Sequence, residues 1–293
     1  MSDSESIAMT PLLSSAGLRP THPVQAIDEF GDQRDLRVAG EFPLTIKVDE
    51  REVVTLMTLG THPELLTLGY LRNQRLVESV TDIKSIRVEW DQETAHVETR
   101  AGQGIVDWES KLSKRTVTTG CGQGTMFSWT LNKIYESPLP AASVRQSTLY
   151  GLLKNIAQYN EIYKQAGAVH GCALCEDTEI ELFVEDVGRH NAADTIAGQM
   201  WMDGTSGGNK IFYTTGRLTS EIVMKVAHMG IPILLSRSGV TFMGLELAQD
   251  LRVTMIARAK GRHFLVYNGA NTIEYDQVPQ RRAAIAKRHL ATG

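Results

Sequence analysis

A single cysteine in a glycine-rich run is the residue of this sequence best suited to nucleophilic chemistry. Residues 118–125 read Thr-Thr-Gly-Cys-Gly-Gln-Gly-Thr, so Cys121 lies among glycines at alternate positions. Glycine leaves the sulfur uncovered and lets the backbone bend, as in a loop that presents a side chain. The nearby cations Lys111, Lys114 and Arg115 favour the thiolate, which is the reactive form. We predict a nucleophilic Cys121, with an inert surface cysteine as the alternative.

Three runs in the second half combine small hydroxyl side chains, glycine and arginine or lysine. They are residues 214–217 (Thr-Thr-Gly-Arg), 236–239 (Ser-Arg-Ser-Gly) and 258–262 (Arg-Ala-Lys-Gly-Arg). Each follows a predicted strand, where an open parallel sheet binds ligands beside helix N-termini. A guanidinium group can donate hydrogen bonds to two phosphate oxygens at once. The runs therefore predict a phosphate-bearing ligand, with solvated turns as the alternative. The sequence has no Walker loop and no well-placed G-x-G-x-x-G, which argues against an ordinary NTPase or dehydrogenase.

The run His170-Gly171-Cys172-Ala173-Leu174-Cys175 contains residue types that bind zinc. On a strand, however, His170 and Cys172 would point to one face and Cys175 to the other. Zinc deaminases also need a glutamate where Cys172 stands. We therefore expect no protein-held metal, and keep a redox pair, a zinc hydrolase and simple core packing as alternatives.

The elements that must position these residues alternate between strand and helix after the rigid break at 137–140. The pattern predicts a helix from Ser147 as N-cap to about Gly167, strands at 168–174 and 179–184, and a helix capped by Asn191. Strands at 210–214, 231–235 and 253–257 then alternate with helices at 220–229 and 241–251, and a last strand covers 264–268. This order is typical of parallel strands with helices packed across them.

The first half predicts a smaller unit of mixed structure. A hairpin is expected over 42–59, a helix capped by Thr61 up to about Asn73, and strands at 83–90 and 94–99. Residues 1–38 show no helical or strand period and predict a mobile arm or an extension that wraps an edge. We expect three parts: the arm at 1–38, a small α+β domain at 39–140 that ends in the Cys121 loop, and an α/β domain at 141–293.

Composition excludes several classes of protein. The chain has 293 residues, 42% hydrophobic and 22% charged, and a net charge of -4, which argues against a nucleic-acid-coating surface. No apolar run approaches the roughly 20 residues that span a bilayer. Three cysteines cannot all pair and no basic-then-apolar leader opens the chain, so we expect a cytoplasmic protein without nucleic-acid or membrane partners.

With these motifs in order, the chain resembles the formate dehydrogenase accessory sulfurtransferase family, FdhD, from about residue 40 to 270. The run Glu185-Asp186-Val187-Gly188-Arg189-His190-Asn191-Ala192 is the most specific match. Further matches are Gly69-Tyr70-Leu71, Thr119-Gly120-Cys121-Gly122, Thr215-Gly216-Arg217 before Ser220-Glu221-Ile222-Val223, Ser236-Arg237-Ser238, and the segments at 257–258 and 266–267. The resemblance implies a cytidine-deaminase-like three-layer α/β domain that has lost its zinc site, beside the smaller N-terminal domain.

The resemblance also implies a function. In that family a loop cysteine, here matched by Cys121, takes sulfur from a cysteine desulfurase as a persulfide. It passes that sulfur to the molybdenum bis(molybdopterin guanine dinucleotide) cofactor of formate dehydrogenase. The resemblance assigns cofactor contact to the run Ile256, Ala257, Arg258, Ala259, Lys260, Gly261 and Arg262, and we add Arg217 from the preceding loops. The expected partners are thus the desulfurase and formate dehydrogenase, and the expected assembly is a homodimer.

One position departs from the family pattern. Many members have C-x-x-C in this loop, whereas Gly124 replaces the second cysteine here. Persulfide formation needs one nucleophile, so we expect a one-cysteine sulfurtransferase. The alternative is a chaperone that binds the cofactor without transferring sulfur.

Overall fold

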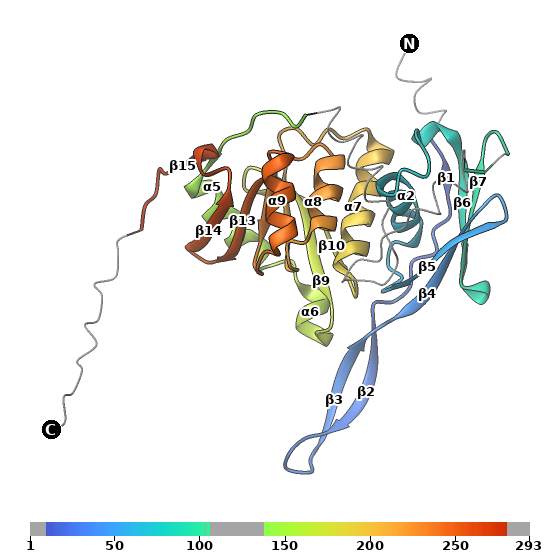
Figure 1. The fold of residues 1–293 in the computed structure, drawn as a ribbon. Helices are drawn as coiled ribbons and strands as arrows, with labels where there is room; N and C mark the ends of the chain where they lie inside the picture. Colours follow the sequence, from blue (N-terminus) through green and yellow to red (C-terminus); the bar gives the residue numbers. More distant parts are fainter. Residues whose placement is uncertain (1–9, 103, 106–137, 280–293) are drawn as a thin grey trace.

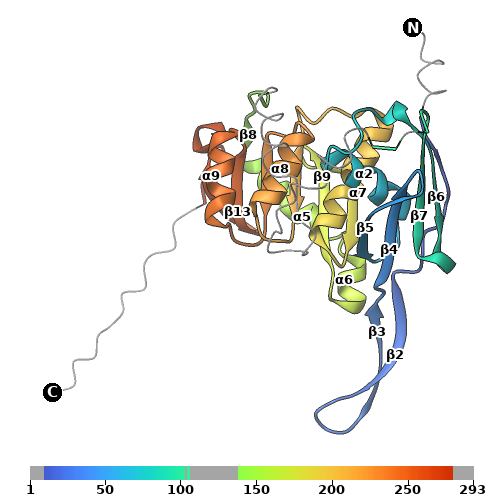
Figure 2. The ribbon, with the colours of Figure 1, turned by 45° about the vertical axis from the view of Figure 1, so that its right-hand side comes forward.

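The computed structural model describes residues 10–102, 104–105 and 138–279, which form two sheets joined through a pair of packed helices (Figure 1). Helix α2 (Pro63–Asn73) belongs to the first half of the chain and α7 (Arg189–Asp203) to the second. In both ribbon views the two helices lie between the sheets (Figures 1 and 2). No helix among the described residues is long and apolar enough to cross a membrane.

The larger sheet has six strands in the order β10-β9-β11-β12-β13-β14. Its central strands β11, β12 and β13 run parallel, as the alternating pattern predicts, and β9, β10 and β14 pair antiparallel at the sides. The strands are β9 (His170–Glu176), β10 (Glu179–Asp186), β11 (Ile211–Thr214), β12 (Ile233–Ser236), β13 (Thr254–Lys260) and β14 (His263–Asn268).

Helices cover both faces of this sheet. One core contains apolar side chains of α7, α8 (Ser220–His228) and α9 (Phe242–Asp250) against alternate strand residues such as Cys172 and Leu234. The other core contains α5 (Gln146–Ile156) against the intervening residues, such as Cys175 and Leu235. Because neighbouring strand residues point to opposite faces, strands this apolar must be covered on both sides.

The smaller sheet has the order β1-β6-β7-β4-β5, and α2 packs on one of its faces. Its strands are β1 (Leu12–Leu13), β4 (Phe42–Val48), β5 (Arg51–Thr58), β6 (Ile83–Glu89) and β7 (Thr94–Thr99), so the predicted hairpin and strand pair are confirmed. Short 3-10 turns at η1 (Val80–Asp82), η2 (Trp90–Gln92) and η3 (Ala270–Thr272) and the small pair β8 (Val144–Arg145) with β15 (Ile273–Glu274) complete the described elements.

Residues 10–38 differ from the unstructured arm that their sequence predicts. Strand β1 adds to the edge of the small sheet beside β6, in agreement with the edge-wrapping alternative. Glu64 holds the next residues by accepting hydrogen bonds from Ser14 Oγ at 2.5 Å and the Ala16 amide at 2.9 Å. Strands β2 (Thr21–Ile27) and β3 (Gln33–Ala39) then pair as a ribbon that projects from the body of the molecule (Figures 1 and 2). Apolar and polar residues alternate over short stretches such as 35–38, but both faces of the ribbon stay largely exposed, so this weak pattern does not build a core.

Four predicted helix boundaries are wrong for physical reasons. The N-cap of α2 is His62 instead of Thr61, because Pro63 occupies the first helical position, where proline is favoured. The helix expected to run to Gly167 ends at Ile156, and a separate helix α6 (Glu161–Ala166) follows a break that contains Asn160. The N-cap of α5 is Arg145, because Ser147 instead hydrogen-bonds Asp276. Helix α7 begins two residues before Asn191. The Asn191 amide donates to Met57 O at 2.7 Å and Asp186 Oδ1 at 2.8 Å, so it joins the two halves instead of capping the helix.

Glycines set the distance between α2 and α7. A Cβ built on Gly69 would lie 1.6 Å from Asp194 O, and one built on Gly198 would lie 2.1 Å from Leu65 O. The two backbones are therefore in direct contact at this crossing, where no larger residue fits. The Arg72 guanidinium, which donates to Ala197 O at 2.9 Å, adds a polar link across the same interface.

Candidate functional site

The predicted ligand loops meet at one edge of the six-stranded sheet. Arg237 N donates to Thr214 O at 3.3 Å, Ser236 Oγ donates to Gly216 O at 2.6 Å, and Arg258 N donates to Ser238 O at 2.9 Å. Helices α7, α8 and α9 all begin at this edge, because each follows a strand that ends there. Their first amide groups give the edge a positive potential in addition to its arginines. The predicted loops at 214–217 and 236–239 therefore lie together, and Arg258 of the third run joins them, whereas residues 258–260 belong to β13 and its turn lies farther along.

A cavity of about 360 Å³ opens at this edge, between the strand ends and α6. No carboxylate is among its lining residues, whereas each of three other cavities among the described residues contains at least two. Its lining residues are Asn160, Tyr163, Val169, His170, Thr215, Arg237 and Ser238. A concave site with one arginine, three hydroxyl side chains and no acid favours an anionic guest.

The imidazole of His170 is a neutral hydrogen-bonding group in this cavity. Burial lowers its pKa, and the nearby guanidinium groups of Arg189 and Arg217 lower it further. His170 Nδ1 lies 3.3 Å from Thr215 Oγ1, which also accepts a hydrogen bond from the Gly171 amide at 3.0 Å. The sequence patterns single out His170 only as a metal ligand, whereas its place in the structure is that of a wall residue in the cavity.

Successive residues of the family-matching run at 185–191 bind the elements around this edge to one another. Glu185 accepts hydrogen bonds from the Ile162 and Tyr163 amides and so fixes α6 beside the cavity. Buried Asp186 accepts from Thr58 Oγ1 at 2.6 Å and from the Leu59 amide at 3.0 Å, which ties the small sheet to the same point. Burial raises the pKa of Asp186, and these hydrogen bonds oppose that rise.

The next residues of the run face inward toward α8. The stem of Arg189 lies against Gly216, where an added Cβ would be 2.4 Å from Arg189 Cδ. His190 is buried, and its Nε2 lies 3.3 Å from Glu221 Oε2. Burial lowers the pKa of His190 well below its ordinary value, and Lys225 and Arg189 act in the same direction. Sequence patterns alone give no signal for this cluster, because its members are far apart in the chain.

The residues predicted to bind the cofactor fall into two groups. Arg217 and Arg258 are exposed and flank the loop at 238–239, since Leu218 N donates to Gly239 O and Arg258 N to Ser238 O. Lys260, Gly261 and Arg262 lie farther along, in the turn between β13 and β14, and the Arg262 guanidinium lies 5.6 Å from the Tyr150 ring. The side chains of Ile256, Ala257 and Ala259 are fully buried in the two cores, so only their backbone could meet a ligand.

The predicted nucleophile Cys121 and its Gly124 neighbour lie outside the described residues, as does the whole loop at 118–125. The two other cysteines are both buried in strand β9. Cys172 packs in the α7–α9 core and its Sγ lies 3.3 Å from Thr214 Oγ1, whereas Cys175 packs in the α5 core. Since they point to opposite faces, His170, Cys172 and Cys175 cannot converge on one metal ion.

We predict that Cys172 and Cys175 are inert toward alkylating reagents in the folded protein. Burial raises the pKa of each thiol to about 12, from an ordinary value of 9.0. This lowers the thiolate fraction at neutral pH roughly 1,000-fold, before limited access is counted. Mass spectrometry after brief iodoacetamide treatment should find both sites unlabelled in buffer and labelled in denaturant. Rapid labelling of either site in the native protein would contradict this assignment.

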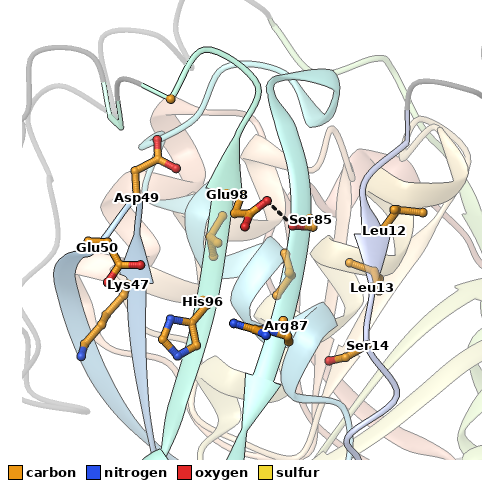
Figure 3. A pocket seen from close by; sticks show the side chains of 13 residues that line it. Leu12, Leu13, Ser14, Lys47, Asp49, Glu50, Ser85, Arg87, His96 and Glu98 are labelled. Carbon is orange, nitrogen blue, oxygen red and sulfur yellow. Dashed lines mark hydrogen bonds between the residues drawn. The ribbon is translucent and has the colours of Figure 1, made fainter.

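The largest of the four cavities, about 650 Å³, lies elsewhere, on the outer face of the small sheet (Figure 3). Lys47, His96 and Arg87 project there beside Glu98, whose carboxylate accepts a hydrogen bond from Ser85 Oγ at 3.2 Å. The Asp49 carboxylate already accepts hydrogen bonds from the Thr99 and Gly104 amides. The cavity contains charges of both signs, and its Arg87 and Glu98 form ion pairs with the neighbouring Glu89 and Lys84. This arrangement is typical of a solvated sheet face, so the cavity is not the candidate site.

The fold and the edge together define an α/β protein with a candidate site at the carboxyl ends of its strands. The sequence profile of the FdhD/NarQ family matches residues 39–274, so the chain belongs to that family. It is 33% identical over 245 residues to the sulfur carrier protein FdhD of Listeria monocytogenes serotype 4b, covering 80% of this chain and 91% of that one. Against the sulfur carrier protein FdhD of Bacillus subtilis strain 168 the identity is 28% over 232 residues, with 79% and 88% covered.

The comparison with solved structures agrees. A crystal structure described as that of a formate dehydrogenase accessory protein from Desulfotalea psychrophila superposes with a TM-score of 0.67. The two chains are 26% identical, and the match covers 87% of this chain and 98% of the other. The family resemblance drawn from the motifs is therefore confirmed.

Proposed function

We propose that this protein is a cytoplasmic sulfur carrier for formate dehydrogenase that moves sulfur through Cys121. Membership of the FdhD/NarQ family and relatives named sulfur carrier protein FdhD support this assignment. The observation that carries the binding half of the proposal is the acid-free cavity at the strand ends, bordered by arginines. The larger unit would then be a cytidine-deaminase-like domain that uses its strand ends to bind a client cofactor instead of zinc.

The first chemical step is a thiol exchange. The Cys121 thiolate attacks the outer sulfur of a persulfide on a cysteine desulfurase, so a new S–S bond forms on Cys121 and the desulfurase cysteine leaves as a thiolate. No net oxidation occurs in this step. Delivery as sulfide to the molybdenum client needs two electrons, which the client metal or an external thiol must supply, since Gly124 removes a second loop cysteine.

The residues at the strand ends fit the client chemically. Arg217, Arg237 and Arg258 offer guanidinium groups to phosphate oxygens, and the amides at the starts of α8 and α9 offer further donors. Lys260 and Arg262 would extend the contact along the β13–β14 turn. The molybdenum bis(molybdopterin guanine dinucleotide) client has several phosphates, which suits a site with its cations in two groups. We also propose that the working assembly is a homodimer.

Sulfur loading at Cys121 tests the proposal that the protein transfers sulfur. Incubation with a cysteine desulfurase and cysteine should add one sulfur atom, detected on the Cys121 peptide by mass spectrometry. Cys121→Ala should lose the adduct and all sulfur transfer, whereas the matched variant Cys175→Ala should keep both. No adduct on the wild type, together with full activity of Cys121→Ala, would refute the transfer role. Normal maturation of formate dehydrogenase by Cys121→Ser would instead favour the cofactor chaperone, the alternative that Gly124 raises.

Binding of a guanine nucleotide is the test of the site. GDP has the phosphates and base of the client, and we expect calorimetry to detect its binding below millimolar concentration. Arg237→Gln should lower the affinity for GDP roughly 5- to 30-fold, because a charge-assisted hydrogen bond contributes about 1–2 kcal/mol to binding. Arg34→Gln, an arginine on the distant ribbon, should leave the affinity unchanged. Undetectable binding to the wild type, or equal losses in both variants, would count against the strand-end site.

A further inference from the structure

A second cavity, of about 470 Å³, lies beside α6 and has the opposite electrostatic character to the candidate site. It contains the side chains of Glu161 and Glu185, and no lysine or arginine is among its lining residues. The remaining lining residues are Thr61, His62, Gln158, Tyr159, Ile162 and Phe183. Burial lowers the pKa of His62 despite the opposing effects of Glu64 and Asp186, so its imidazole does not offset the two carboxylates at neutral pH.

The walls of this cavity suit a cationic side chain. The rings of Tyr159 and Phe183 pack together with centroids 5.5 Å apart at 42°, which presents aromatic surface beside the carboxylates. A guanidinium or ammonium group over such rings is attracted by their negative faces. The Glu161 carboxylate makes no hydrogen bond with the described residues, whereas Glu185 is held in place by the Ile162 and Tyr163 amides. One acid is thus free to pair and the other is fixed.

A free cation would bind here only weakly, because an exposed ion pair adds little affinity. The occupant must therefore bring additional surface. Exposed aromatic surface borders the cavity, since Tyr159 is 43% exposed and Tyr163, one turn along, is 56% exposed. The β2–β3 ribbon contacts α6 and leaves Leu36 and Val38, which share one of its faces, 52% and 44% exposed. Helix α6, whose residues Glu161 and Ile162 line the cavity, and the ribbon lie next to each other below the six-stranded sheet (Figures 1 and 2).

We propose that this cavity, the exposed ring of Tyr159 and the apolar face of the ribbon form one docking surface for a partner protein that presents an arginine or lysine. Charge complementarity selects the side chain, and the apolar rim selects a protein over a small amine. The two cavities are lined by different residues of the α6 region, Tyr159, Glu161 and Ile162 here and Asn160 and Tyr163 at the acid-free cavity, so a docked partner and an anionic guest would contact the same short segment through different side chains. This proposal goes beyond the sulfur-carrier function and does not depend on Cys121.

The test uses the full chain and three probes observed by NMR: acetyl-Leu-Arg-Leu-amide, its uncharged citrulline counterpart, and putrescine. The arginine peptide should bind saturably at millimolar concentration, shift resonances of Tyr159 and Phe183, and bind at least 5-fold more tightly than the citrulline peptide. Glu161→Gln should remove that preference, whereas Glu246→Gln, an exposed acid on α9, should keep it. Leu36→Ser on the ribbon should weaken binding of the arginine peptide and leave binding of putrescine unchanged.

Other results would overturn the proposal. Equal binding of the arginine and citrulline peptides would exclude charge recognition, and no saturable binding of the arginine peptide would exclude the site. Tighter binding of putrescine than of the peptide would assign the cavity to a small amine. GDP affinity serves as an independent readout, because it reports on the strand-end site and should be the same in wild type, Glu161→Gln and Leu36→Ser.

Discussion

Replacing Gly69 by alanine is expected to destabilise the protein by about 3 kcal/mol or more. The new Cβ would lie 1.6 Å from Asp194 O and 2.7 Å from the Gly198 amide nitrogen. Both neighbours are backbone atoms of α7, so no rotamer change relieves the overlap and the helices must separate. Overpacking a close contact typically costs 1–3 kcal/mol, and backbone contacts lie at or above the upper end of that range. The separation would also disturb the run at 185–191, which begins α7 and holds the strand-end cavity.

Urea denaturation of the wild type and variant measures this effect. Gly208→Ala is a matched control, because a Cβ there would meet only ordinary contacts, the nearest at 3.4 Å, and should change stability by less than about 0.5 kcal/mol. Gly198→Ala, on the opposite helix, should repeat the loss seen for Gly69→Ala. Similar stability of Gly69→Ala and Gly208→Ala would show that α2 and α7 do not cross as closely as described.

The second large effect is expected when Lys225→Met removes one partner of a buried ion pair. Lys225 Nζ lies 2.7 Å from Asp194 Oδ1 and 2.6 Å from Oδ2, and both side chains are almost completely buried. Breaking such a pair leaves an uncompensated buried charge and costs about 3–5 kcal/mol. The Asn73 amide, at 2.7 Å from Asp194 Oδ1, stabilises the remaining carboxylate only in part.

The size of this loss should depend on pH in a defined direction. Burial already raises the pKa of Asp194 in the wild type, and Lys225 opposes that rise, so the variant should raise the pKa further. An acid with a raised pKa in the folded state binds its proton more tightly there than in the unfolded state. Below the pKa of the acid in the unfolded state, this difference leaves the free energy of unfolding unchanged. As pH rises above that value, the acid increasingly destabilises the folded state. The deficit should be larger at pH 8 than at pH 5, as measured by urea denaturation.

A double variant separates the charge effect from simple packing. Lys225→Met combined with Asp194→Asn removes both charges, and it should recover at least 1 kcal/mol relative to Lys225→Met alone. A single-variant loss below 1 kcal/mol, or a deficit independent of pH, would contradict the role assigned to this pair.

Much of the fold follows from local patterns in the sequence. The hairpin of β4 and β5 and the parallel strands β11–β13 have clear periodicity and turn residues, so their positions agree with prediction to within a few residues. The meeting of the loops at 214–217, 236–239 and 258–262 also follows, because parallel strands end at one edge. Asn191 illustrates the limit: its side chain suits an N-cap, but a distant carbonyl and Asp186 compete for it.

The features that sequence patterns miss depend on contacts between distant residues. The β2–β3 ribbon has only a short apolar alternation and no buried face, so its sequence differs little from that of a mobile arm. His190 is buried beside Glu221, 31 positions along the chain, and only the packing of α7 on α8 brings them together. Asn160 and Tyr163 join the strand-end cavity because the chain breaks between α5 and α6, which a continuous helical period conceals.

The backbone contact between α2 and α7 determines how this molecule can change shape. The two sheets and their helices meet at this contact through glycine backbone atoms, a buried carboxylate and a guanidinium-to-carbonyl hydrogen bond. No layer of flexible side chains lies between α2 and α7 about which the two parts could rotate. The clamshell motion by which many two-part proteins enclose a guest is therefore unavailable to them.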